Sequence, residues 1–254
     1  MVLRDTLKER GYICGLMLRL VRNPAVCCLQ KNAGMDFLML DCEHGNYSME
    51  TLHDLFIMAR GRGIGAMVRL PEGTKTWVSR VLDAGAAGFL VPYCETREQV
   101  ETLVYYAKYK PVGNRGFCPA GGHTNYAGGA AKDILPYQND RVIAMAQIES
   151  KKAVDNIDEL ASVEGLDALF MGPADLSISL GVPGEVTHPL VIEAIQKVAD
   201  ACKRHNLMFG MQAGDKLLEM FADDLQIIMN GDDSVILQEG FKKKVQFMQG
   251  LKNK

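Results

Sequence analysis

The chain has 254 residues, 48% of them hydrophobic and 23% charged, and its 28 basic and 31 acidic residues give a net charge of -3. A near-neutral chain offers no positive field for nucleic acid or an anionic membrane, so we expect small-molecule partners. Because the N-terminus lacks an apolar signal core and no apolar run approaches the roughly 20 residues of a membrane span, we expect a cytoplasmic protein.

Short apolar runs alternate with longer segments of helical period. The runs predict strands at 13–18, 37–40, 64–68, 88–91, 142–146, 166–171, 207–211 and 225–229. The segments between them predict helices at about 24–33 and 48–60, one that carries Trp77 and ends at Gly85, one from Thr96 to near Pro111, one capped by Ser150, and three more at 189–205, 215–221 and 234–250.

The eight runs are continuous rather than alternating in hydrophobicity, which is typical of strands covered on both faces. Helices separate nearly all of them, and no linker or repeat intervenes. The simplest interpretation is a single (β/α)8 TIM barrel over residues 1–254, with a doubly wound open sheet as the structural alternative. The irregular, glycine-rich segment 118–131 is long enough to be either mobile or functional.

Two carboxylates follow neighbouring predicted strands. Glu149 comes just after the fifth run and Asp175 just after the sixth. Parallel strands joined by a helix end on the same side of their sheet, so these two side chains are expected to meet. Hard divalent cations often sit on one or two carboxylates, which predicts a metal site. The plainer alternative is a first-turn helix residue and a helix cap.

Other polar side chains also end the predicted strands, namely Asp41, His44, Arg69 and Gln147. In a barrel all of them face one mouth, where such enzymes place their chemistry. A lone histidine is more often structural and a lone arginine more often a surface charge. Four separate strand ends with complementary polar groups favour an active site.

Seven motifs in this chain occur in a familiar order. They are Leu40-Asp41-Cys42-Glu43-His44, Val68-Arg69, Leu82-Asp83-Ala84-Gly85, Val91-Pro92, Asn114-Arg115-Gly116, Gln147-Ile148-Glu149 and Gly172-Pro173-Ala174-Asp175-Leu176. From about residue 11 to residue 240 the chain closely resembles the HpcH/HpaI family, the metal-dependent class II 2-oxo acid aldolases of the 4-hydroxy-2-oxoheptanedioate aldolase type.

The resemblance implies a phosphoenolpyruvate/pyruvate-type barrel, a Mg²⁺, Mn²⁺ or Co²⁺ cofactor, and a homo-oligomer, often a hexamer (a trimer of dimers) that exchanges its C-terminal helix. It also implies a role in the catabolism of aromatic compounds or sugar acids. The implied roles are His44 as catalytic base, Arg69 as transition-state stabiliser, Asp83 as the carboxylate that makes this histidine more basic, Glu149 and Asp175 as metal ligands, and Gln147 and Ala174 as contacts to the 2-oxo acid. We expect Asp41 to contact the substrate as well.

The chemistry of these residue types agrees with that implication. Breaking a carbon–carbon bond beside a ketone requires an enolate, whose oxygen a chelated divalent ion and a fixed cation such as Arg69 would stabilise. Backbone N–H groups of Ala174 and Asp175 are placed to bind the carboxylate of pyruvate. His44 would move the proton at the hydroxyl of the cleaved bond.

The role of Asp83 needs a second subunit. Just before Gly85, it is expected near the end of its own barrel opposite the mouth. It would reach His44 only from a neighbouring subunit or through an unusual turn. The alternative is a helix-terminal acid without a catalytic role.

Other functions fit the sequence less well. A Schiff-base aldolase needs a desolvated lysine at a strand end, and only Lys151 and Lys152 come near. The glycine-rich stretch 61–65 precedes its strand, whereas a dinucleotide fingerprint follows one. A relative that condenses oxaloacetate with acetyl-CoA or decarboxylates oxaloacetate remains open, as does a non-catalytic 2-oxo acid binder. Departures from the family at Met17, in the longer first strand–helix connection and in the stretch 121–126 leave the aldehyde undefined.

Overall fold

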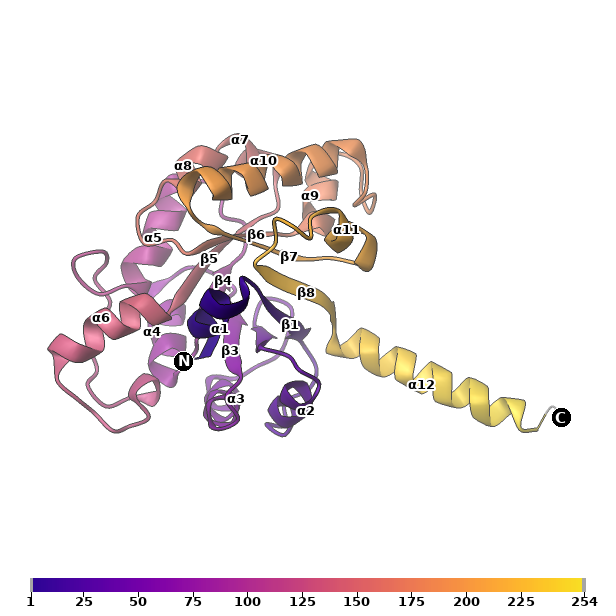
Figure 1. Cartoon of the computed structure of the whole chain (residues 1–254), viewed down its shortest axis with the longest axis horizontal. Helices are drawn as coiled ribbons and strands as arrows, with labels where there is room; N and C mark the ends of the chain where they lie inside the picture. Colours follow the sequence, from indigo (N-terminus) through magenta and orange to yellow (C-terminus); the bar gives the residue numbers. More distant parts are fainter. Residues whose placement is uncertain (1, 253–254) are drawn as a thin grey trace.

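The computed structural model describes residues 2–252 and forms a closed barrel of eight parallel strands (Figure 1). Each strand pairs with the next along the chain, and β8 closes the barrel against β1. This arrangement confirms the predicted (β/α)8 TIM barrel over the doubly wound sheet. The strands are β1 (Ile13–Leu18), β2 (Phe37–Asp41), β3 (Gly65–Arg69), β4 (Gly88–Val91), β5 (Ile143–Ile148), β6 (Ala168–Met171), β7 (Met208–Gln212) and β8 (Ile227–Asp232).

The helices cover the outside of the barrel (Figure 1). They are α1 (Val2–Arg10), α2 (Val26–Asn32), α3 (Met49–Gly61), α4 (Lys75–Ala84), α5 (Arg97–Ala107), α6 (Ala131–Arg141), α7 (Lys151–Asp155), α8 (Ile157–Ala161), α9 (Pro173–Ser179), α10 (Pro189–His205), α11 (Asp215–Met220) and α12 (Asp233–Gly250), with a 3-10 turn η1 (Gly122–Thr124).

Several helix ends are fixed by the signals seen in the sequence. The Ser48 and Ser150 side chains each accept a hydrogen bond from the backbone N–H three residues on, and Thr96 and Gln99 form a capping box. Gly85 ends α4 with φ of 114°, a left-handed conformation that glycine adopts without a Cβ clash.

The apolar side chains form two layers. One lies between the strands and the surrounding helices, and the other fills the inside of the barrel. Leu3 of α1 belongs to the inner layer and packs so closely on Gly65 at the start of β3 that a Cβ there would lie 2.6 Å from it. Since parallel strands all begin at the same end, α1 closes the amino-terminal end of the barrel. The carboxyl-terminal end of the strands is not covered in this way and can hold a binding site.

The prediction differs from the structure in four segments. Helices α1 and α6 were not predicted, because α1 is strongly polar and α6 contains Pro136, which removes one backbone donor and usually interrupts a helix. The helix after Ser150 is two short helices that meet at Asn156. After β6, where no helix was predicted, the chain forms the short helix α9, started by Pro173 at a position where proline is favoured.

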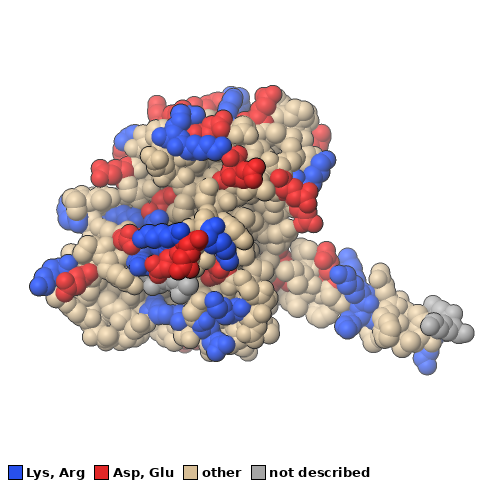
Figure 2. Space-filling model, in the orientation of Figure 1, with Lys and Arg blue, Asp and Glu red and all other residues tan. Residues whose placement is uncertain are grey.

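Helix α12 projects away from the barrel (Figure 1), and Asp233 is its one buried residue. Among the described residues, no helix combines the length and hydrophobicity that crossing a bilayer requires. On the face shown in Figure 2 the basic and acidic side chains are interspersed, and neither sign dominates.

Candidate active site

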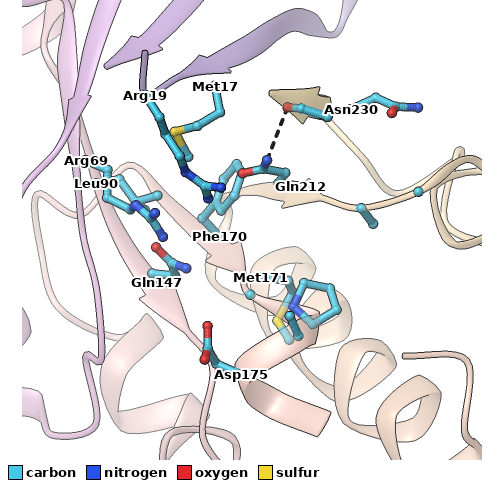
Figure 3. Close-up of a pocket in the computed structure, with 16 residues that line it drawn as sticks. Met17, Arg19, Arg69, Leu90, Gln147, Phe170, Met171, Asp175, Gln212 and Asn230 are labelled. Atoms are coloured by element: carbon cyan, nitrogen blue, oxygen red, sulfur yellow. Dashed lines mark hydrogen bonds between the residues drawn. The ribbon is translucent and has the colours of Figure 1, made fainter. Parts of the chain in front are cut away.

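The carboxyl ends of the strands surround a cavity of about 340 Å³. Three apolar residues at its wall, Met17, Leu90 and Phe170, also belong to the core inside the barrel. Figure 3 shows Asp175 on the opposite side of the cavity from Arg19. The cavity is lined by Met17, Arg19, Arg69, Leu90, Gln147, Phe170, Met171, Gly172, Pro173, Ala174, Asp175, Gln212, Ala213, Gly214, Asn230 and Gly231.

Glu149, directly after β5, is held in one orientation. The residue is 1% exposed; Oε1 accepts a hydrogen bond from the backbone N–H of Tyr93 at 2.8 Å, and Oε2 accepts one from Nε2 of Gln147 at 2.6 Å. Tyr93 has φ of 49°, a left-handed conformation uncommon for a bulky residue, in the connection after β4. The ends of two adjacent strands therefore fix one carboxylate.

Asp175 and Ala174 lie in the first turn of α9, and both line the cavity. The N–H groups of a first turn have no acceptor within the helix, so they are available to an anion. Gly172 leaves the space that this arrangement needs, because a Cβ there would lie 2.5 Å from Oε2 of Glu149 and 2.9 Å from Nε2 of Gln147.

These carboxylates suit a divalent cation. Burial raises the pKa of Glu149 to about 7; the N–H of Tyr93 opposes this shift, and the charges of Asp175 and Glu43 add to it. A carboxylate whose pKa is raised by burial and by neighbouring negative charges is stabilised by a bound cation. Oε1 of Gln147 is buried and has no hydrogen-bond partner among the described residues. The donor set therefore fits Mg²⁺, Mn²⁺ or Co²⁺.

The chain would supply only part of the coordination. Within residues 2–252 no group of three or more His, Cys, Asp or Glu side chains is arranged to hold a metal ion. Two carboxylates leave positions for water and for the oxygens of a chelating substrate, as is usual for Mg²⁺.

Arg69 and Asp41 form a buried pair at the ends of β3 and β2, where the strand register places them side by side. Nε of Arg69 donates to Oδ1 of Asp41 at 2.9 Å, and Nη2 donates to Oδ2 at 2.6 Å. Burial lowers the pKa of Arg69, but the hydrogen bonds and charge of Asp41 outweigh this effect and raise it. The guanidinium is therefore a permanent cation on the cavity wall.

Asp41 lies behind this wall. It is fully buried, does not line the cavity, and accepts hydrogen bonds from Arg69, from Nε of Arg19 at 2.8 Å, and from the backbone N–H groups of Glu43 and His44. Burial raises the pKa of Asp41, but these donors, Arg69 foremost, lower it overall. The arrangement supports a role in positioning the two arginines rather than the substrate contact expected from the sequence.

Glu43 was given no role in the sequence prediction, yet it lies among the charged groups of the site. Its Oε2 is 3.1 Å from Nη1 of Arg69 and 3.9 Å from Nε2 of His44. Burial raises the pKa of Glu43, Arg69 and His44 oppose this shift, and Asp41 and Asp175 add to it.

His44 lies in the connection after β2, with a side chain that is 60% exposed. It does not line the cavity, and its nearest charged partner is Glu43. In the single chain, no described contact therefore fixes the imidazole for proton transfer.

Asp83 lies in the last turn of α4, which ends near the amino-terminal end of the barrel, where β4 begins. Its carboxylate accepts a hydrogen bond from Nη2 of Arg115 at 2.6 Å and lies 4.0 Å from Nδ1 of His123. Asp83 and His44 are at opposite ends of one barrel, as the sequence indicated. A link between them stays a prediction about two subunits.

The sequence matches the family model described as HpcH/HpaI aldolase/citrate lyase over residues 17–238. The chain belongs to this family. A relative, the 5-keto-4-deoxy-D-glucarate aldolase of Shigella sonnei, is 35% identical over 181 residues, which make up 71% of this chain and 70% of the relative.

Solved structures support this membership in the HpcH/HpaI family. The HpcH/HpaI aldolase from Desulfitobacterium hafniense DCB-2 is similar with a TM-score of 0.93 at 33% identity, covering 97% of this chain and 96% of that chain. Citrate Synthase SbnG has a TM-score of 0.89 at 27% identity and covers 99% of both chains. The protein is therefore an enzyme, a carbon–carbon lyase of the HpcH/HpaI family.

Sequence reasoning missed several polar residues of this HpcH/HpaI site. Arg19 follows β1 and Gln212 ends β7, which is the signal that identified Arg69, but neither lies in a motif that carries the family resemblance. Tyr93 acts through its backbone N–H, for which its side chain gives no signal.

Proposed function

We propose that the protein is a metal-dependent aldolase that cleaves a 4-hydroxy-2-oxo acid to pyruvate and an aldehyde, or forms it from them. The observation that supports this most is one cavity lined by Asp175, Gln147 and the fixed cation of Arg69, with the buried carboxylate of Glu149 hydrogen-bonded to Gln147 at the end of the strand next to that of Asp175. Family membership supports the reaction class, and this arrangement of charges supports binding of the 2-oxo acid end of the substrate.

Glu149 and Asp175 would hold Mg²⁺, Mn²⁺ or Co²⁺ together with the carboxylate and keto oxygens of the 2-oxo acid. When bound, the cation supplies a Lewis acid that stabilises negative charge on the keto oxygen. Arg69 adds a second positive charge, and Asp41 keeps the guanidinium in place so that it needs no reorganisation as charge develops.

The first turn of α9 would bind the substrate carboxylate through the N–H groups of Ala174 and Asp175, because these donors have no partner within the helix. Gln147 would donate the second hydrogen of Nε2 to an oxygen of the 2-oxo acid, since the first is donated to Oε2 of Glu149. Both contacts would place the reactive carbon next to Arg69.

His44 would take the proton from the 4-hydroxyl group as the carbon–carbon bond breaks, a role worth roughly 10²–10⁴-fold in rate. Its exposed position needs support from a second chain, and we propose that Asp83 of a neighbouring subunit supplies it. The half-exposed Asp83 carboxylate, which Arg115 and His123 flank, is available at the surface for such a contact.

We also propose that the protein is a homo-oligomer, a hexamer built as a trimer of dimers, that exchanges α12 between subunits. Along this projecting helix large apolar side chains are exposed, including Phe241 at 65% and Phe247 at 67%. A helix whose apolar residues are largely exposed in its own chain is stabilised when a second copy covers them.

The aldolase proposal is tested by measuring pyruvate release from a panel of 4-hydroxy-2-oxo acids, with EDTA and then with added Mn²⁺. We expect EDTA to abolish release and Mn²⁺ to restore it. Glu149→Gln should remove the restored activity, whereas Glu164→Gln, at an exposed position outside the cavity, should keep it. Release that is indifferent to chelation would contradict the proposal.

A second function has a specific observation in its favour, namely the likeness to Citrate Synthase SbnG. Condensation of oxaloacetate with acetyl-CoA, or decarboxylation of oxaloacetate, would use the same carboxylates and Arg69. Citrate formed from oxaloacetate and acetyl-CoA, without pyruvate release from the aldol panel, would favour it. A non-catalytic binder is not proposed, because the matching family model and the similar relatives carry the names of enzymes.

A further inference from the structure

Arg19 has no role in the proposed reaction, although it lines the cavity. It is the first residue after β1, within the connection that differs from the resembling family, and it lies on the side of the cavity away from Asp175 (Figure 3). Gln212 lies on the same side of the cavity, and its Nε2 donates to the carbonyl of Gly231 at 3.2 Å.

The guanidinium of Arg19 is held in a fixed position. Nε donates to Oδ2 of Asp41 at 2.8 Å, and Nη1 donates to Oδ2 of Asp232 at 3.1 Å. The backbone N–H groups of Arg19, Leu20 and Val21 all donate to the carboxylate of Asp233. Both the side chain and its backbone are therefore placed before any ligand binds.

One edge of this guanidinium remains open. Among the described residues Nη2 of Arg19 has no hydrogen-bond partner, and the side chain is 36% exposed beside the cavity. The planar donors of arginine match the geometry of a carboxylate, which accepts two parallel hydrogen bonds. The amide of Gln212 adds a neutral hydrogen-bonding group in the same cavity.

We propose that Arg19 is the specificity-determining residue of the cavity and selects substrates whose end distant from the 2-oxo acid carries a carboxylate. This inference rests on the proposed function, which places the 2-oxo acid at Gln147 and Asp175. A substrate with a carboxylate at each end would then span the cavity from the first turn of α9 to Arg19.

The competing interpretation is purely structural. Asp232 is the N-cap of α12, so Arg19 also connects the end of β2 to the start of that helix. If this connection were its only role, loss of the guanidinium would reduce activity on every substrate to the same degree. The two interpretations therefore differ in selectivity.

The test compares two 4-hydroxy-2-oxo acids of equal chain length, one ending in a carboxylate and one in a primary hydroxyl. Pyruvate release is measured with Mn²⁺ for the wild type, Arg19→Gln, Arg19→Lys and Arg22→Gln, the last an exposed arginine of the same connection that lies outside the cavity. Exchange of the methyl protons of pyruvate in D2O, followed by NMR, reports enolate formation without any acceptor.

We expect the wild type to prefer the dicarboxylate, and Arg19→Gln to reduce the ratio of the two kcat/KM values by roughly 10- to 100-fold, as for loss of a charged hydrogen bond. Arg22→Gln should keep the ratio. Arg19→Lys retains the positive charge but not the planar pair of donors, so we expect it to lower the ratio of the two kcat/KM values by less than Arg19→Gln does. This variant also tests the inference if Arg19→Gln fails to fold.

A wild type without preference, or an equal loss on both substrates in Arg19→Gln, would overturn the inference. If the wild type exchanges the protons of pyruvate, the proposed function survives that result and only the role of Arg19 is lost. If there is neither exchange nor pyruvate release, both are wrong.

Discussion

Replacing Gly172 by alanine is expected to weaken the binding of the divalent cation through a steric effect alone. The residue has φ of -109°, so the substitution adds no left-handed strain. The backbone hydrogen bond from the N–H of Gly172 to the carbonyl of Ile148 does not involve the added methyl group.

The size of the effect follows from the carboxylate of Glu149. The new Cβ would lie 2.5 Å from Oε2, so this oxygen must move by roughly 0.9 Å to reach ordinary contact. The movement breaks the 2.6 Å bond from Gln147 or the 2.8 Å bond from Tyr93. Since disturbing the partners of a metal ligand typically costs about 10- to 100-fold in affinity, we expect that loss for Mn²⁺, with about 1–3 kcal/mol lost from the free energy of unfolding.

The affinity is measured by titrating Mn²⁺ calorimetrically in the presence of oxalate, a chelating analogue of a 2-oxo acid. Gly61→Ala is the matched control, because no atom lies within 4 Å of its added Cβ. Unchanged Mn²⁺ affinity in Gly172→Ala would refute the reasoning that Glu149 is a ligand held against this glycine.

Three further predictions concern the charged groups. Asp41→Asn should lower the free energy of unfolding, measured in urea, by about 3–5 kcal/mol, because Arg69 and Arg19 then lose a buried counter-charge. Arg69→Lys should lower kcat by roughly 10²-fold while Mn²⁺ affinity changes little, since lysine cannot keep the two-pronged bond to Asp41. Burial, with the charge of Arg115, lowers the pKa of His123, so the unfolded chain takes up the proton first. The stability that this histidine contributes is present above an unfolded pKa of about 6.5 and is lost as the pH falls below it, so His123→Gln should lose less stability than the wild type between pH 7 and pH 5.

Different results would count against each of these. An Asp41→Asn protein as stable as the wild type would mean that the two arginines find other partners. Arg69→Lys with full turnover would remove Arg69 from the stabilisation of charge. Parallel stability curves for His123→Gln and the wild type below pH 7 would mean that His123 is already solvated in the folded state.

The sequence predicted the barrel well because every strand is a continuous apolar run between clear helix signals. The runs at 13–18 and 88–91 coincide with β1 and β4, and the others differ by a few residues at their ends. The missed helix α6 shows the limit, because Pro136 argues locally against a helix and no buried apolar face marks the segment, Gln138 being its one buried residue.

For the site, parallel topology alone was enough to bring Gln147, Glu149 and Asp175 to one end. The sequence does not show how a polar residue at a strand end is paired, and so Asp41 was expected on the substrate although it lies behind Arg69. The left-handed turn at Tyr93 depends on contacts across the β4 and β5 connections, which a tyrosine does not signal.

Leu3 and the rest of α1 block the amino-terminal end of the barrel, so the cavity can be entered only from the carboxyl-terminal end. The two products of a cleavage inside this barrel must therefore leave through the same opening, the product nearer the opening first and the deeper one after it. Product-inhibition patterns should therefore show an ordered exit, and the fragment released last should be the one that competes with the incoming substrate.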